Sequence, residues 1–196
     1  KLAVPLHFHF GFGEFSAKII YVHFYGNGNI QSVTLFPKER LTLHLPFGEV
    51  AVRTGFSLYE DGALQTLEPA EPTPVPTLVG TLHAYDSNPI GITADRNSLR
   101  FREDGTLARL ATVTDKIVVQ TPDAPVQKAS PLDDRLTVTR PVIAEFPDGG
   151  VRLTCEGTWD YSLSECAFSI LSVPYAAAFS DCSGCSGCDG FCGRLK

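Results

Sequence analysis

Four cysteines lie close together near the C-terminal end of the chain, and they are the side chains with the clearest chemical potential. They are Cys182, Cys185, Cys188 and Cys192. Their spacing is C-x2-C-x2-C-x3-C, with glycine in each gap. Two-residue spacers turn successive sulfurs towards one concavity, and glycines without a Cβ let backbone N–H groups approach a bound centre. Thiolates are soft ligands, so the pattern predicts a metal or cluster site.

The spacing resembles the cluster-binding run of bacterial ferredoxins, which implies a [4Fe–4S] cluster held by these four thiolates. The proline that follows such a run in ferredoxins is Gly193 here, and the chain has no second run. Either Cys192 ligates the same cluster, or Cys155, Cys166 or a residue of a partner protein completes it. Two alternatives remain open: a structural zinc site, and a tail that is disulfide-bonded or disordered.

Cys155 and Cys166 stand apart from this run, on either side of Trp159. They are candidates for an additional ligand or for a disulfide with each other. The simpler interpretation is that both are buried as small hydrophobic side chains, as free cysteines commonly are.

The whole composition limits the classes of partner. The net charge of −6 and the pI of about 5.3 argue against nucleic acid and against a polybasic membrane contact. No apolar run is long enough to cross a bilayer. Crowding of the cysteines at one end favours a ligand set in a reducing compartment over an extracellular disulfide framework, which predicts a cytoplasmic protein. The chain begins at Lys1 without a methionine, so an N-terminal leader could be missing.

A short element recurs along the part of the chain that must position the cysteines. Asn27-Gly28, Asp61-Gly62 and Asp104-Gly105 each separate two apolar runs, and Asp148-Gly149 is a weaker fourth copy. Asn-Gly and Asp-Gly between apolar runs are the strongest local signal for a β-hairpin, because the tight turn needs positive φ. The chain is therefore expected to be built from repeats.

A second recurring element precedes these hairpins, with an apolar residue followed by Gly13, Gly48 or Gly80. Each unit should contain a strand opened by this glycine and then the two arms of the hairpin. We predict an all-β fold of antiparallel repeated hairpins, either a meander or a short solenoid-like array. The β domain should cover residues 1–175, with a possible subdivision near 121–141, and residues 176–196 should form an irregular cysteine-rich tail.

Three other segments carry weaker signals. His7 and His9 share one strand face and could share a metal, although a solvated face is the ordinary interpretation. Asp86, Asn88 and Gly91 match part of a calcium loop, but the expected glutamate is Asn97. Residues 68–76 are rich in proline and should be a surface loop without strand pairing.

The repeated hairpins resemble β-hairpin repeats of bacterial proteins, loosely of the MORN and WG types. This resemblance implies a repeat scaffold and no particular activity. We expect a β-repeat scaffold carrying an iron–sulfur cluster for electron transfer or redox sensing. The alternative is a non-enzymatic protein-binding module whose tail holds zinc or disulfides. No catalytic motif is present, so an enzyme is the less favoured class, and a protein partner is expected.

Overall fold

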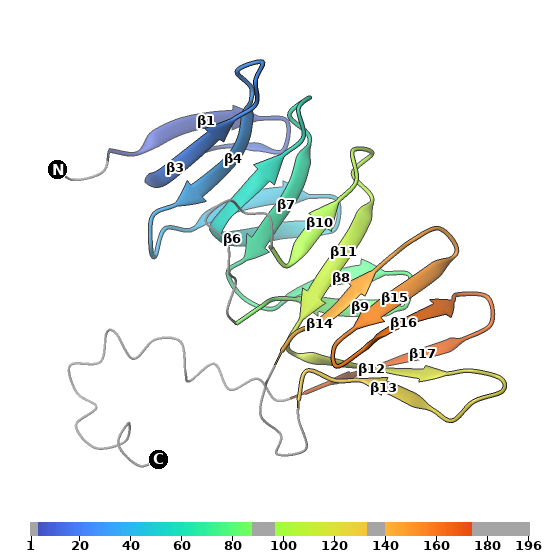
Figure 1. The fold of residues 1–196 in the computed structure, drawn as a ribbon. Coiled ribbons are helices and arrows are strands. Elements are labelled where there is room, and N and C mark those ends of the chain that lie inside the picture. The colour runs from blue at the N-terminus through green and yellow to red at the C-terminus, as the bar shows by residue number, and fades with distance from the viewer. Residues whose placement is uncertain (1–3, 88–96, 133–139, 174–196) are drawn as a thin grey trace, which may run out of the picture.

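The computed structural model describes residues 4–87, 97–132 and 140–173 (Figure 1). Strands make up 61% of the structure, and the described residues contain no helix. Every strand-to-strand pairing is antiparallel. The predicted all-β class of antiparallel hairpins is confirmed.

The largest sheet has ten strands, in the order β16-β15-β14-β11-β10-β7-β6-β4-β3, with β5 paired to β6. The strands are β3 (Ile19–Phe24), β4 (Ile30–Leu35), β5 (Leu41–Leu45), β6 (Gly48–Leu58), β7 (Leu64–Pro69), β10 (Leu99–Phe101), β11 (Leu107–Thr112), β14 (Val142–Glu145), β15 (Gly150–Thr154) and β16 (Thr158–Ser162). Four successive hairpins thus stand side by side, each paired to the next (Figure 1).

A second layer of shorter sheets lies behind the main sheet (Figure 1). Its strands are β1 (Leu6–Phe10), β2 (Gly13–Ala17), β8 (Thr73–Thr77), β9 (Gly80–Ala84), β12 (Asp115–Gln120), β13 (Gln127–Ala129) and β17 (Ala167–Ser172). The eleven-residue β6 takes part in both layers: its first half forms a hairpin with β5, which packs against β2 of the second layer, and its second half pairs with β4 and β7. One repeat is therefore a hairpin of the second layer followed by a hairpin of the main sheet.

The repeated Asx-Gly dipeptides form the turns of the main-sheet hairpins. Gly28, Gly62, Gly105 and Gly149 have φ between 71° and 90°, which only glycine adopts at little cost. In the first three turns the glycine N–H donates to the carbonyl three residues earlier, at 2.9–3.0 Å. The preceding Asn27, Asp61 and Asp104 accept a backbone N–H through their side chains. The positive φ predicted for these turns is confirmed.

One row of directly opposed apolar residues crosses the whole main sheet. It runs through Val22, Val33, Phe56, Leu67, Leu99, Leu110, Ala144, Leu153 and Trp159. The seven residues from Val33 to Leu153 are fully buried. Each repeat therefore contributes side chains to one continuous core, as expected of units that cannot bury an apolar face alone.

The proline-rich segment differs from the loop expected from the sequence. Residues 68–76 were predicted to be a loop without strand pairing, but Thr73–Thr77 forms β8, which pairs with β9 along its whole length. Pro74 and Pro76 are exposed, whereas the alternate residues Thr73 and Val75 are buried. Among the described strands β8 pairs only with β9, so the missing proline N–H groups fall on a strand edge, where proline is tolerated.

The main sheet continues across the segment at which a subdivision was expected. β11 lies before residues 121–141 and pairs with β14 after them. Between them, β12 and β13 join β17 in a three-stranded sheet of the second layer.

Candidate binding clefts at the turn edge

The cysteines singled out from the sequence fall into two groups. Cys182, Cys185, Cys188 and Cys192 lie outside the described residues. Cys155 and Cys166 are described: both are free thiols, half-buried, and packed against the hydrophobic core. They lie close enough to Tyr161 that their charges add to burial in raising the pKa of its hydroxyl. Here they act as small core side chains beside Tyr161.

The other metal candidates are engaged differently. The His7 ring lies 3.1 Å from the hydroxyl of Ser16, and the His9 ring is hydrogen-bonded to the carboxylate of Glu14. No group of three or more potential ligands gathers anywhere in the described part of the chain. Of the calcium-loop residues, Asn88 and Gly91 fall outside this part, whereas Asn97 is buried and donates its amide to Thr66 at 3.1 Å.

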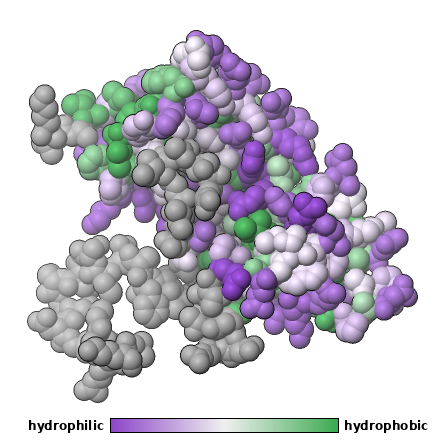
Figure 2. All heavy atoms as spheres, viewed as in Figure 1, coloured by the Kyte–Doolittle hydropathy of each residue, from purple (hydrophilic) through white to green (hydrophobic). Residues whose placement is uncertain are grey.

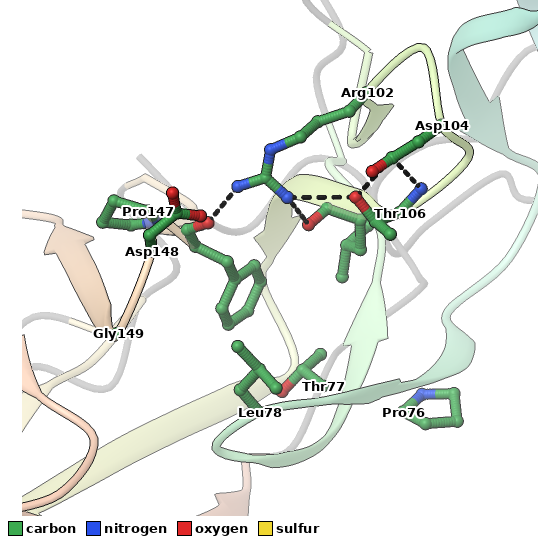
Figure 3. Close-up of a pocket in the computed structure, with 11 residues that line it drawn as sticks. Pro76, Thr77, Leu78, Arg102, Asp104, Thr106, Pro147, Asp148 and Gly149 are labelled. Carbon is green, nitrogen blue, oxygen red and sulfur yellow. Dashed lines mark hydrogen bonds between the residues drawn. The ribbon is translucent and has the colours of Figure 1, made fainter.

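A cleft of about 690 Å³ opens where the turns of neighbouring repeats meet (Figure 3). The turn after β10 contributes Arg102, Asp104 and Thr106 to one wall, and the β8–β9 turn contributes Leu78 opposite them. The next main-sheet turn closes the side with residues 147–149. Its size is within the range of ordinary ligand sites.

The polar groups of this cleft are held in place by local hydrogen bonds. One side-chain oxygen of Asp104 accepts from the N–H and the hydroxyl of Thr106, at 2.8 and 2.6 Å. These bonds lower the pKa of Asp104, so its carboxylate is ionised at neutral pH. Arg102 donates to Thr106 and to the carbonyls of Leu107 and Phe146. Its donors are therefore largely used within the protein, and Asp104 with Asp148 outweighs its single positive charge at the rim.

A second cleft, of about 530 Å³, lies one repeat earlier along the same edge. Its Asp61, Leu64, Phe101 and Gly105 occupy the repeat positions that Asp104, Leu107, Phe146 and Gly149 occupy in the first. Leu45 and Pro46 of the β5–β6 turn take the place of the β8–β9 turn. Both clefts combine an apolar floor with an aspartate at the rim, because both are built by the same repeat.

The repeats are joined at this edge by a bond that recurs with them. The Tyr25 hydroxyl donates to the carbonyl of Leu58 at 2.8 Å, and the Tyr59 hydroxyl donates to the carbonyl of Phe101 at the same distance. Arg102 makes the corresponding bond to Phe146. In each case the first turn residue of one hairpin fixes the residue that precedes the turn of the next. The walls of the clefts are thus held in register.

One histidine–carboxylate pair was not anticipated from the sequence. Asp115 is fully buried and lies 3.0 Å from the ring of His83, and it also accepts the His83 backbone N–H and the Thr112 hydroxyl. Among the described residues no serine, threonine or cysteine hydrogen-bonds to the His83 ring. The pair ties β9 to β12.

The sequence indicated the turns but not the clefts between them. Asp61 and Asp104 were identified as turn residues, but their position at a cleft rim depends on turns that are distant in the sequence. Comparisons of the chain with protein-family models, with curated proteins and with solved structures found no match. No helix in the described part of the chain is long and apolar enough to span a membrane.

Proposed function

We propose that this protein is a non-enzymatic, protein-binding β-repeat scaffold, and that the turn-edge clefts receive an extended segment of a protein partner. The observation that carries the proposal is the recurrence of one cleft design in successive repeats. Repeat proteins characteristically bind extended partners along a surface that the repeat builds again and again. A single isolated hollow would not favour a chain-like ligand in this way.

The chemistry of the clefts defines the segment that fits. Their floors are apolar, with Leu64 and Phe101 in one and Leu107 and Phe146 in the other. Their rims carry Asp61, and Asp104 with Asp148, on a chain with a net charge of −6. Apolar side chains flanked by lysine or arginine complement this pattern in shape and charge.

Leu78 provides the test, because it lines the larger cleft and is 66% exposed, so its removal spares the fold. A labelled peptide of alternating lysine and leucine should bind, and the matched peptide with glutamate for lysine should not. Leu78→Ser should raise the Kd for the lysine peptide by a factor of about 10 to 100, since burying a leucine contributes ~1.5–3 kcal/mol. Fluorescence anisotropy measures both.

The matched control is Leu171→Ser, a 51% exposed leucine on β17 that lines neither cleft. It should leave the Kd unchanged. Equal affinity for the two peptides, or an equal effect of the two leucine variants, would contradict the cleft as the binding site.

A second function is favoured by the cysteine spacing. We propose that Cys182, Cys185, Cys188 and Cys192 ligate a [4Fe–4S] cluster for electron transfer or redox sensing, carried by the repeat scaffold in the cytoplasm. The support is chemical: four soft thiolate donors lie within eleven residues, with the spacing of cluster-binding runs. Zinc held by the same thiolates is the alternative.

Anaerobic purification should then give a brown protein that absorbs at about 400 nm and contains about four irons per chain. Replacing Cys185 and Cys188 by serine should abolish the colour and the iron. Cys155→Ser serves as the control and should retain both. A colourless anaerobic preparation with zinc, or without metal, would refute the cluster.

A further inference from the structure

β3 is the last strand of the main sheet, and among the described strands it pairs only with β4. Its sequence, Ile-Ile-Tyr-Val-His-Phe, contains no proline and no carboxylate, lysine or arginine. Ile20 and Phe24 are 55% and 60% exposed, and Tyr21 is also exposed. Figure 2 shows apolar side chains gathered at this end of the molecule. Natural edge strands are usually protected by charged residues, by proline or by a covering segment, and β3 contains neither charged residues nor proline.

Alternate residues of β3 point their backbone N–H and C=O groups away from β4. In later repeats the residues equivalent to Phe24 direct their backbone groups towards the preceding hairpin. The carbonyls of Leu58 and Phe101 accept tyrosine hydroxyls of that hairpin. The N–H of Phe146 donates to the carbonyl of Ala108. By the same repeat geometry, the N–H and C=O of Phe24 point out of the sheet. Alternation along the strand places those of Val22 on the same side.

We propose that two copies of this chain associate by antiparallel pairing of their β3 strands about a two-fold axis. The direction of the strands selects this arrangement. Nine strands lie on the path from β16 to β3, each antiparallel to the next, so the two end strands run in the same direction. Head-to-tail stacking would therefore place β16 parallel to β3, against the pattern of the sheet. A two-fold axis perpendicular to the sheet places β3 antiparallel to its copy.

The register of this pairing follows from the row of directly opposed apolar residues that crosses the main sheet. If Val22 lies opposite Val22 of the partner subunit, the row of buried residues that ends at Val22 continues into the second copy. The groups of Val22 that point outward then meet those of Val22 of the partner subunit, which also point outward. The same register places Tyr21 opposite His23 of the partner subunit, and Phe24 opposite Ile20 of the partner subunit. The exposed apolar side chains of β3 thereby cover one another, at a self-complementary interface without charges.

Sedimentation velocity over a wide range of protein concentration, with reductant present, tests the association. The wild-type chain should form a dimer, and Phe24→Lys should shift it to monomer. Leu171→Lys adds the same charge at an exposed leucine of β17 and should leave the dimer intact. A wild-type chain that stays monomeric, or a dimer that tolerates Phe24→Lys, would overturn the proposal and leave the edge to a different partner.

Two double variants test the register. Tyr21→Lys with His23→Lys places like charges opposite each other twice in the dimer, whereas Tyr21→Lys with His23→Glu places opposite charges there. The dimer Kd of the first should exceed that of the second about tenfold, because two cross-strand pairs are affected. Equal dimer Kd values for the two double variants would refute the register centred on Val22. Binding of the lysine–leucine peptide should be the same in all these variants, so this test is independent of the clefts.

Discussion

Replacing Phe56 by alanine is expected to lower the free energy of unfolding by about 3–5 kcal/mol. Phe56 is fully buried in the core row of the main sheet. Its ring meets those of Phe10, Phe12 and Phe15 edge-on, with centroids 5.7–5.9 Å apart. These three residues belong to the β1–β2 hairpin, so Phe56 joins the second layer to the main sheet. Alanine leaves a cavity and removes three aromatic contacts at once.

Urea unfolding followed by circular dichroism measures the effect. Phe36→Ala is the matched control, because Phe36 is 45% exposed and should cost far less. Hydrogen exchange adds a local readout: the amides of β1 and β2 should lose protection in Phe56→Ala before those of β14 and β15. Equal destabilisation by the two alanine variants would contradict the assigned role.

Glu68→Ala should be destabilising to a similar extent, about 3–5 kcal/mol. Glu68 is fully buried and accepts the Ser98 N–H at 2.7 Å and the Ser98 hydroxyl at 3.0 Å. Arg53 lies 3.3 Å from the carboxylate, donates to the carbonyl of Pro69 and stacks on Tyr85. Removing the carboxylate leaves the buried Ser98 N–H without its acceptor and the largely buried Arg53 guanidinium without its acidic partner.

Urea unfolding again gives the magnitude, with Glu103→Ala in an exposed turn as the control. That variant should remain within about 0.5 kcal/mol of the wild type. A loss in Glu68→Ala no larger than in Glu103→Ala would show that Arg53 and Ser98 find other acceptors.

The same carboxyl group should leave a signature in the pH dependence of stability. Burial raises the pKa of Glu68, while the bonds from Ser98 and the charge of Arg53 oppose this shift. An acid whose pKa is higher in the folded than in the unfolded state stabilises the fold most below the unfolded value. That contribution is lost as the pH rises through the folded value. Glu68→Gln removes this dependence, so the stability difference between variant and wild type should vary with pH in this interval. A stability difference that does not change with pH would contradict the raised pKa of Glu68.

The sequence predicted the parts of this fold that depend on neighbours in the chain. Asp61-Gly62 and Asp104-Gly105 form their turns because a positive φ and an Asx hydrogen bond are set within five residues. The glycines that open β2, β6 and β9 could be recognised for the same reason, since each has a positive φ. The proline-rich segment was wrongly interpreted, because Pro74 and Pro76 are compatible with a strand at an edge and incompatible with one at a centre. Sequence alone does not show which strand is at an edge.

The sites depended on residues that are distant in the chain. The acceptor for Ser98 is Glu68, 30 residues away, and the wall that faces Leu78 comes from the turns at 102–106 and 147–149. No local pattern marks such pairs, because the pairing order of the strands brings them together. The metal-binding role of Cys182, Cys185, Cys188 and Cys192 stays a prediction from spacing.

By itself the sequence determined that this chain forms repeated antiparallel hairpins, because turn conformation and the alternation of side chains are local properties. Only the tertiary structure decided how the repeats stack, and with that the buried carboxylate, the two clefts and the open edge at β3. Each of these arises between repeats, where the contacts join residues that no short stretch of sequence contains.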